Sequence, residues 1–178
     1  GRAAAARTQW MRLVVRTIAT MLRSPASSAP IGQPRAPSNS ISAAPRATVH
    51  PLGGFHVIFG TGKFFEYDDQ TNLDVQSIYG LWDKPGNTSP IDKAGTYQLG
   101  LDQATDANNI VQRTLDGLAN FSWQIHSGWY FDLVAKNQPP AGERVVANPV
   151  VDLGYLRITS FQPSVVDDPC EGGGSSYF

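Results

Sequence analysis

The chain has 178 residues, of which 41% are hydrophobic and 16% are charged, and its formal net charge is −1. A chain of this length can bury a core, and its 17 glycines and 13 prolines are typical of a turn-rich β protein. No apolar run reaches the 18 residues that a membrane-spanning helix needs. A single cysteine, Cys170, excludes an internal disulfide framework, so it is interpreted either as a free thiol or as one half of a bridge to another chain.

Residues 1–50 differ in charge from the rest of the sequence. They carry seven of the 14 basic residues and no acidic residue, because the first acid is Glu66. From residue 51 onward the other seven basic residues face all 15 acids, a net charge of −8 that disfavours nucleic-acid binding by this part. The sequence therefore predicts a basic N-terminal segment with a linker over residues 1–40 and a folded region over residues 41–178.

The N-terminal segment itself has two pieces. Residues 10–22 (WMRLVVRTIATML), with Arg23 directly after them, place Arg12, Arg16 and Arg23 on one side of a helical projection, which predicts a basic amphipathic helix. Residues 24–47 are crowded with Pro, Ser and Ala and are typical of a flexible linker. The same composition arises when a GC-rich gene is read in the wrong frame. The segment is interpreted as either a genuine helix or non-native sequence, and contact with a membrane surface is the least favoured reading.

Beyond residue 41 the predicted elements are short strands. Their segments are rich in β-branched and aromatic residues and are bounded by Gly, Pro, Asn and Asp. We expect strands over residues 41–48, 55–59, 76–82, 111–115, 122–125, 129–133, 144–151 and 155–161, the last two forming a hairpin around residues 152–154. Residues 84–110 are polar and are predicted to be a long loop or insertion. No helix longer than a turn or two is expected after residue 50, a pattern that favours sheet blades over a parallel α/β layer.

Two blocks of sequence carry a family resemblance. Residues 57–83 read VIFGTGKFFEYDDQTNLDVQSIYGLWD, and the second block joins GWYFDL at 128–133, GERVVANPVV at 142–151 and a DPC-plus-glycine run at 168–174. In this order they resemble the C-terminal β-propeller of the PilY-type family of type IV pilus biogenesis and tip-adhesin proteins. Over residues 41–178 the resemblance implies an all-β fold, a partial β-propeller of antiparallel blades. The matched framework positions are Gly60, Thr61, Gly62, Gln76, Tyr79, Gly80, Trp82, Asp83, Gly128, Trp129, Glu143, Arg144 and Pro149.

The resemblance also implies a function. Family members are non-enzymatic proteins of the cell surface, the pilus tip, the outer membrane or the secreted fraction, with roles in pilus assembly, in opposing retraction, in twitching motility and in adhesion. The implied partners are pilus components such as minor pilins, and a host or abiotic surface. Calcium modulates the family through a loop without a counterpart here, so no catalytic, cofactor or metal residue is carried over. Because a blade takes about 40–45 residues, the chain is interpreted as a fragment with about three blades.

Two polar segments resemble binding motifs, but we predict a structural role for each of them. Residues 60–63 (GTGK) lack the spacing of a phosphate-binding loop and predict a tight bend. Asp68, Asp69, Asn72 and Asp74 offer oxygen atoms of the kind that calcium prefers, but their spacing is not that of an EF-hand, so a solvated turn is favoured.

The histidines and tryptophans are weighed in the same way. His50, His56 and His126 are too scattered for a metal motif and are expected to be satisfied or exposed. Trp82 and Trp129 are predicted to pack in the core, whereas Trp123 is left open between packing and stacking on a sugar or a base.

Two rival interpretations stay open at the level of sequence. One is a propeller enzyme of the quinoprotein dehydrogenase type, which would repeat tryptophan-rich docking motifs, whereas this chain shows one clear Trp-Asp strand end at Trp82-Asp83. The other is a generic surface-binding propeller without a pilus partner, because one fold hosts many functions. The adjacent Glu143 and Arg144 are expected to form a structural ion pair.

Overall fold

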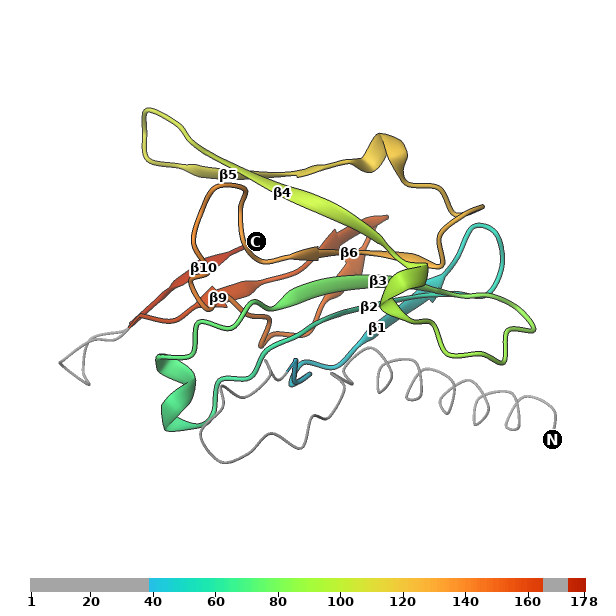
Figure 1. Ribbon diagram of the computed structural model, residues 1–178, viewed down its shortest axis with the longest axis horizontal. Coiled ribbons are helices and arrows are strands. Elements are labelled where there is room, and N and C mark those ends of the chain that lie inside the picture. The colour runs from blue at the N-terminus through green and yellow to red at the C-terminus, as the bar shows by residue number, and fades with distance from the viewer. Residues whose placement is uncertain (1–38, 165–172) are drawn as a thin grey trace.

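The computed structural model describes residues 39–164 and 173–178 (Figure 1). The predicted N-terminal helix and most of the linker lie outside these residues, and so does Cys170. In the described part the regular helices are three short 3-10 turns, namely η1 (Tyr67–Gln70), η2 (Lys93–Gly95) and η3 (Leu118–Asn120). Nothing helical among the described residues has the length and apolar content needed to span a bilayer. The prediction of an all-β fold is confirmed.

A curled six-stranded sheet forms the body of the molecule. Its strands, in spatial order, are β1 (Arg46–Val49), β2 (Phe55–Gly60), β3 (Ser77–Asp83), β6 (Gly128–Asp132), β4 (Tyr97–Thr105) and β5 (Val111–Asp116). Neighbouring strands are antiparallel except at β4 and β6, which pair in parallel from Tyr97 opposite Trp129 to Leu99 opposite Phe131. The expected partial propeller thus takes the form of a half-barrel with one parallel contact.

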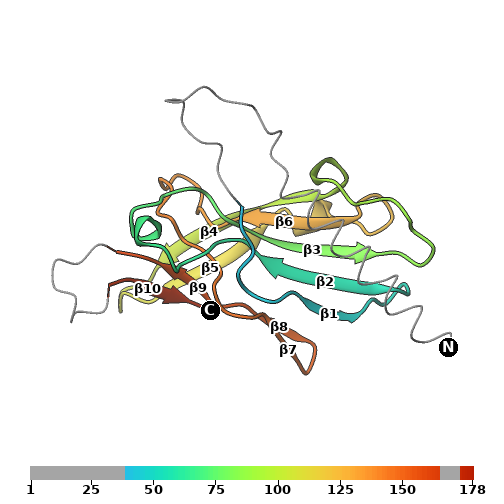
Figure 2. The ribbon, with the colours of Figure 1, turned by 90° about the horizontal axis from the view of Figure 1, so that it is seen from below.

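Two small sheets complete the chain. The hairpin of β7 (Val150–Asp152) and β8 (Tyr155–Arg157) confirms the predicted turn at residues 152–154 and contacts β1. Strand β9 (Ser160–Gln162) pairs with β10 (Ser175–Tyr177). Figure 2 shows β1, β2, β3 and β6 side by side, with the two small sheets along one border.

Alternating side chains give the large sheet two apolar faces, as expected for strands with a period of two. One face carries a cluster of buried residues that consists of Val57, Phe59, Tyr79, Leu81, Tyr130 and Ile91. The other carries Ile78, Trp129 and Phe131, which pack with Ala43, Leu133, Val145 and Ile158. The second face is the one that meets the C-terminal part of the chain.

Three predicted elements were wrong. Residues 84–110 are not simply a loop, because they contain β4. The outer half of β4 is exposed, so its hydrophobic pattern in the sequence is limited to the two buried residues Leu99 and Leu101. Residues 122–125 form a turn, since the amide of His126 donates to the carbonyl of Ser122. Of residues 144–151 only the end is a strand, and Arg144 makes an isolated bridge to Phe161.

Candidate binding groove and buried polar groups

The framework residues inferred from the sequence lie along the centre of the sheet and the segment that crosses it. All are buried except Asp83 and Trp129, which are half-buried. The glycines mark close approaches: a Cβ on Gly80 would lie 2.3 Å from the Trp129 ring, and one on Gly60 would lie 2.4 Å from Val145. These positions are therefore occupied by glycine because a neighbouring side chain fills the space.

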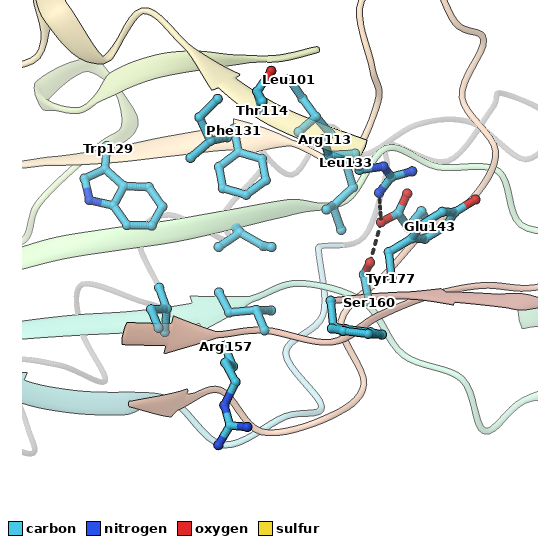
Figure 3. A pocket seen from close by; sticks show the side chains of 15 residues that line it. Leu101, Arg113, Thr114, Trp129, Phe131, Leu133, Glu143, Arg157, Ser160 and Tyr177 are labelled. Carbon is cyan, nitrogen blue, oxygen red and sulfur yellow. Dashed lines mark hydrogen bonds and ion pairs between the residues drawn. The ribbon is translucent and has the colours of Figure 1, made fainter. Parts of the chain in front are cut away.

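A groove of about 500 Å³ lies between the second face of the sheet and the C-terminal strands (Figure 3). Strands β3, β4 and β6 and the segments that follow β6 and β8 supply apolar side chains, which include Ile78, Leu101, Trp129, Phe131, Leu133 and Ile158. Among the sequence-predicted residues, the structure brings Trp129 and Glu143 together in this groove. It is concave and mainly apolar with a few convergent polar groups, which is the usual form of a ligand site.

A paired set of polar groups closes one end of the groove. Arg113 on β5 donates from Nη1 to Oε1 of the buried Glu143 at 2.6 Å and from Nε to Gln103 at 2.9 Å. The Ser160 hydroxyl donates to the same Glu143 oxygen. The Arg113 guanidinium also lies 3.7 Å from the centre of the Tyr177 ring, a cation–π contact. These contacts join β5, β9 and β10 to the segment at Glu143.

The polar groups of this groove are engaged with one another. The Glu143 carboxylate forms an ion pair with Arg113 and accepts a hydrogen bond from the Ser160 hydroxyl. Arg157 points away from the cavity in Figure 3. Across the described residues, no three His, Cys, Asp or Glu side chains converge as metal ligands. Sequence reasoning missed Arg113, Ser160 and Tyr177, because no local motif distinguishes them.

The expected ion pair between Glu143 and Arg144 was wrong. Consecutive residues in extended chain point to opposite sides, and Glu143 turns to Arg113 in the groove. The buried Arg144 turns away and donates to three carbonyl oxygens, those of Gly142 at 2.7 Å, Lys63 at 2.9 Å and Asn72 at 2.5 Å. Burial lowers the pKa of Arg144. It therefore links two parts of the chain that lie about 70 to 80 residues apart in sequence.

Two of the residues that were weighed as calcium ligands, Asp69 and Asn72, bind backbone amides of their own loop. Asp69 was expected in a solvated turn but is buried, and its Oδ2 accepts the amides of Phe65 at 3.0 Å and Glu66 at 2.9 Å. Hydrogen bonds from these amides and the nearby Lys63 ammonium lower the pKa of the Asp69 carboxyl, against the effect of its burial. Asn72 uses its side-chain oxygen to accept the amide of Asp74. These oxygens serve the loop's own backbone.

Two of the histidines lie in an aromatic cluster, His50 buried and His56 half-buried. The Nε2 atom of each is buried without a hydrogen-bond partner among the described residues, so the expectation of satisfied or exposed histidines was wrong for these two. His50 stacks on Trp82 with ring centres 4.4 Å apart, and Trp123 meets His50 and His56 edge to face at 4.5 and 5.3 Å. Trp82 is buried, which supports its core assignment, and its indole N–H donates to the Gly53 carbonyl at 2.8 Å. Trp123 packs in this cluster. His126 stacks on Phe121, which meets Trp123 edge to face with ring centres 4.7 Å apart.

We expect the cluster to make folding sensitive to acid. Burial, and secondarily the charge of His50, lowers the pKa of His56 from 6.5 to about 4. The folded state thus favours neutral His56, and its contribution to stability is complete above pH 6.5 and is lost as the pH falls toward 4. The loss should be on the order of 2 kcal/mol, at about 1.4 kcal/mol per pKa unit and discounted for partial exposure. Urea unfolding of the wild type and of His56→Gln at pH 7.0 and pH 4.5 measures it. An equal pH dependence in both would contradict the assignment.

Comparison with known proteins places the chain in a family. A type IV pilus biogenesis factor PilY1 homolog from Xylella fastidiosa (strain Temecula1) is 32% identical over 131 residues, which are 72% of this chain and 9% of that protein. PilY1 of Pseudomonas aeruginosa is 29% identical in strain PAO1 and 30% identical in strain UCBPP-PA14, over 79% and 85% of this chain. The chain belongs to the PilY1 family. It spans 13% and 15% of these two PilY1 proteins.

Membership in the PilY1 family confirms the resemblance drawn from the two sequence blocks. No family model matches the chain, and no solved structure matches it significantly. The groove and the buried polar groups are therefore described from this structure alone, and the assignment of the 13 matched positions as the family's framework stays a prediction.

Proposed function

We propose that this chain is part of a non-enzymatic type IV pilus protein that acts in pilus assembly, in opposing retraction and in adhesion. The observation that carries the proposal is its similarity to several proteins named type IV pilus biogenesis factor PilY1. The proposed location is the cell surface or the pilus tip. The proposed partners are pilus components, including minor pilins, and the surface to which the cell adheres.

The site chemistry supports binding rather than turnover. The carboxylate in the groove is held in an ion pair with Arg113, and the buried Asp69 caps backbone amides. A quinoprotein dehydrogenase would need a cofactor pocket with polar groups free to bind the quinone. The groove described here is lined mainly by apolar side chains. We propose no cofactor or metal for the described residues, and calcium, where the family uses it, would act at another loop.

The function is tested by removing this region from its gene. An in-frame chromosomal deletion of codons 39–178 should reduce surface pili, measured as major pilin sheared from cells, by about tenfold or more, and should abolish twitching. The same deletion in a strain without the retraction motor separates the two roles. Recovery of pili there indicates opposition to retraction, and continued absence indicates a role in assembly. Unchanged piliation and twitching in the first strain would contradict the proposal.

A further inference from the structure

The connection between β2 and β3 carries a group of exposed apolar side chains. Within residues 63–75, which we call the aromatic loop, Phe65 is 72% exposed, Tyr67 is 89% exposed and Leu73 is 57% exposed. Single exposed apolar residues are ordinary on a protein surface. Three large ones on one 13-residue loop are not, and exposed apolar groups with polar neighbours mark interaction sites.

The aromatic loop is held in one shape from inside. The Arg144 guanidinium binds the carbonyls of Lys63 and Asn72, which lie near the two ends of the loop. The buried Asp69 carboxylate binds the amides of Phe65 and Glu66 between those ends. A loop that is already ordered loses less conformational entropy when it binds a partner. The exposed aromatic residues are thus presented by a preorganised loop.

Phe64 anchors the loop, whereas the largely exposed Phe65 has one contact of its own, the Lys63 ammonium 5.3 Å from its ring centre. Phe64 packs edge to face on Phe161 with ring centres 5.0 Å apart, and the Arg144 guanidinium lies 5.9 Å from the Phe64 ring centre. Phe65 and Tyr67 project from the same loop and remain largely exposed. Rigid, exposed aromatic residues are the side chains that most often dominate binding energy at protein interfaces.

The charge of the aromatic loop indicates what it would bind. Residues 63–75 contain four acids and one lysine, a formal charge of −3. Asp68 and Glu66, which pairs with Lys63, are exposed beside the aromatic residues. An anionic lipid surface would repel this loop. A protein surface with an apolar pocket and basic residues around it would complement both the aromatic side chains and the carboxylates.

We propose that the aromatic loop is a docking surface for a protein partner that presents an apolar pocket edged by lysine or arginine side chains. Phe65 and Tyr67 fill the pocket, and Glu66 and Asp68 meet its basic edge. That this partner belongs to the pilus machinery rests on the function proposed above, whereas the docking surface itself rests on the structure.

The test compares variants of the full-length protein in its own bacterium. The first variant is Phe65→Ser with Tyr67→Ser, and the second is Glu66→Lys with Asp68→Lys. The matched control is Leu153→Ser with Tyr155→Ser, because these residues are 90% and 76% exposed on the β7–β8 hairpin. Immunoblots establish equal protein levels, and thermal melts of the purified chain establish that each variant folds. Surface pili are measured as sheared major pilin, beside the deletion of codons 39–178.

We expect the aromatic variant to reduce surface pili about tenfold, the charge variant to reduce them severalfold and the hairpin control to match the wild type. Wild-type piliation in the aromatic variant, when the deletion is defective, would overturn the docking surface and leave the proposed function standing. An equal defect in the aromatic variant and the hairpin control would also overturn it. A deletion without effect would overturn the proposed function and, with it, the assignment of the loop's partner to the pilus machinery.

Discussion

Replacing Trp82 with alanine is expected to lower the free energy of unfolding by about 3–5 kcal/mol, the range for buried aromatic residues. Trp82 is buried at the end of β3, opposite His56 on β2, with His50 stacked on its ring. Its indole N–H also satisfies the Gly53 carbonyl. The substitution therefore removes packing from the whole histidine–tryptophan cluster and leaves a carbonyl without its donor. Equilibrium unfolding in urea at pH 7 measures the loss.

The control for Trp82→Ala is Tyr155→Ala, which removes an exposed aromatic side chain from a short hairpin. A surface change of this kind should alter stability by about 0.5 kcal/mol or less. A loss below about 1 kcal/mol for Trp82→Ala would place this tryptophan outside the core and contradict the cluster described here.

The strands that the sequence predicted well are those whose local pattern agrees with their tertiary setting. Residues 55–59 and 76–82 are continuous β-forming segments between turns, and they match β2 and β3 to within one residue at either end. Strand β4 was missed because only Leu99 and Leu101 on it are buried, while the other residues of the β4–β5 hairpin are exposed or half-buried. Its parallel pairing with β6 could not be predicted, since local sequence carries no information about which distant strand lies alongside.

Of the candidate site, the sequence predicted the glycine positions of the backbone but not the side chains that pair across the groove. The glycines at 60 and 80 stood out in the motif, and the structure gives each a packing reason. The partner of Glu143 did not stand out, because Arg113 lies 30 residues away and reaches it through the fold. The predicted ion pair between Glu143 and Arg144 relied on their adjacency in sequence, but an extended chain directs adjacent side chains to opposite sides.

That separation gives the two adjacent residues distinct tasks. Glu143 fixes the polar end of the groove through Arg113 and Ser160. The Arg144 side chain points to the other side of the same segment and holds the aromatic loop by donating to two of the loop's carbonyl groups. One buried segment thus positions both the groove and the loop, so damage at Arg144 should be visible in the loop before it is visible in the groove.

Replacing Arg144 with lysine is therefore expected to lower the free energy of unfolding by about 2–4 kcal/mol. A hydrogen bond from a charged donor contributes about 1.5–3 kcal/mol. A lysine ammonium lacks the planar guanidinium group that donates to several carbonyl groups at once. The comparison is with Arg157→Lys, an exposed arginine on β8. Urea unfolding gives the global loss.

Hydrogen exchange of the amides of residues 63–75 gives the local effect of Arg144→Lys. Amides in the aromatic loop should exchange faster than in the wild type, while those of β3 and β6 change only in line with the global loss, since opening of the loop does not require the sheet to open. Wild-type stability together with wild-type exchange in the loop would show that the contacts of Arg144 with the Lys63 and Asn72 carbonyl groups do not hold the loop. In that case the preorganisation of Phe65 and Tyr67 would depend on Asp69 and on the packing of Phe64 against Phe161.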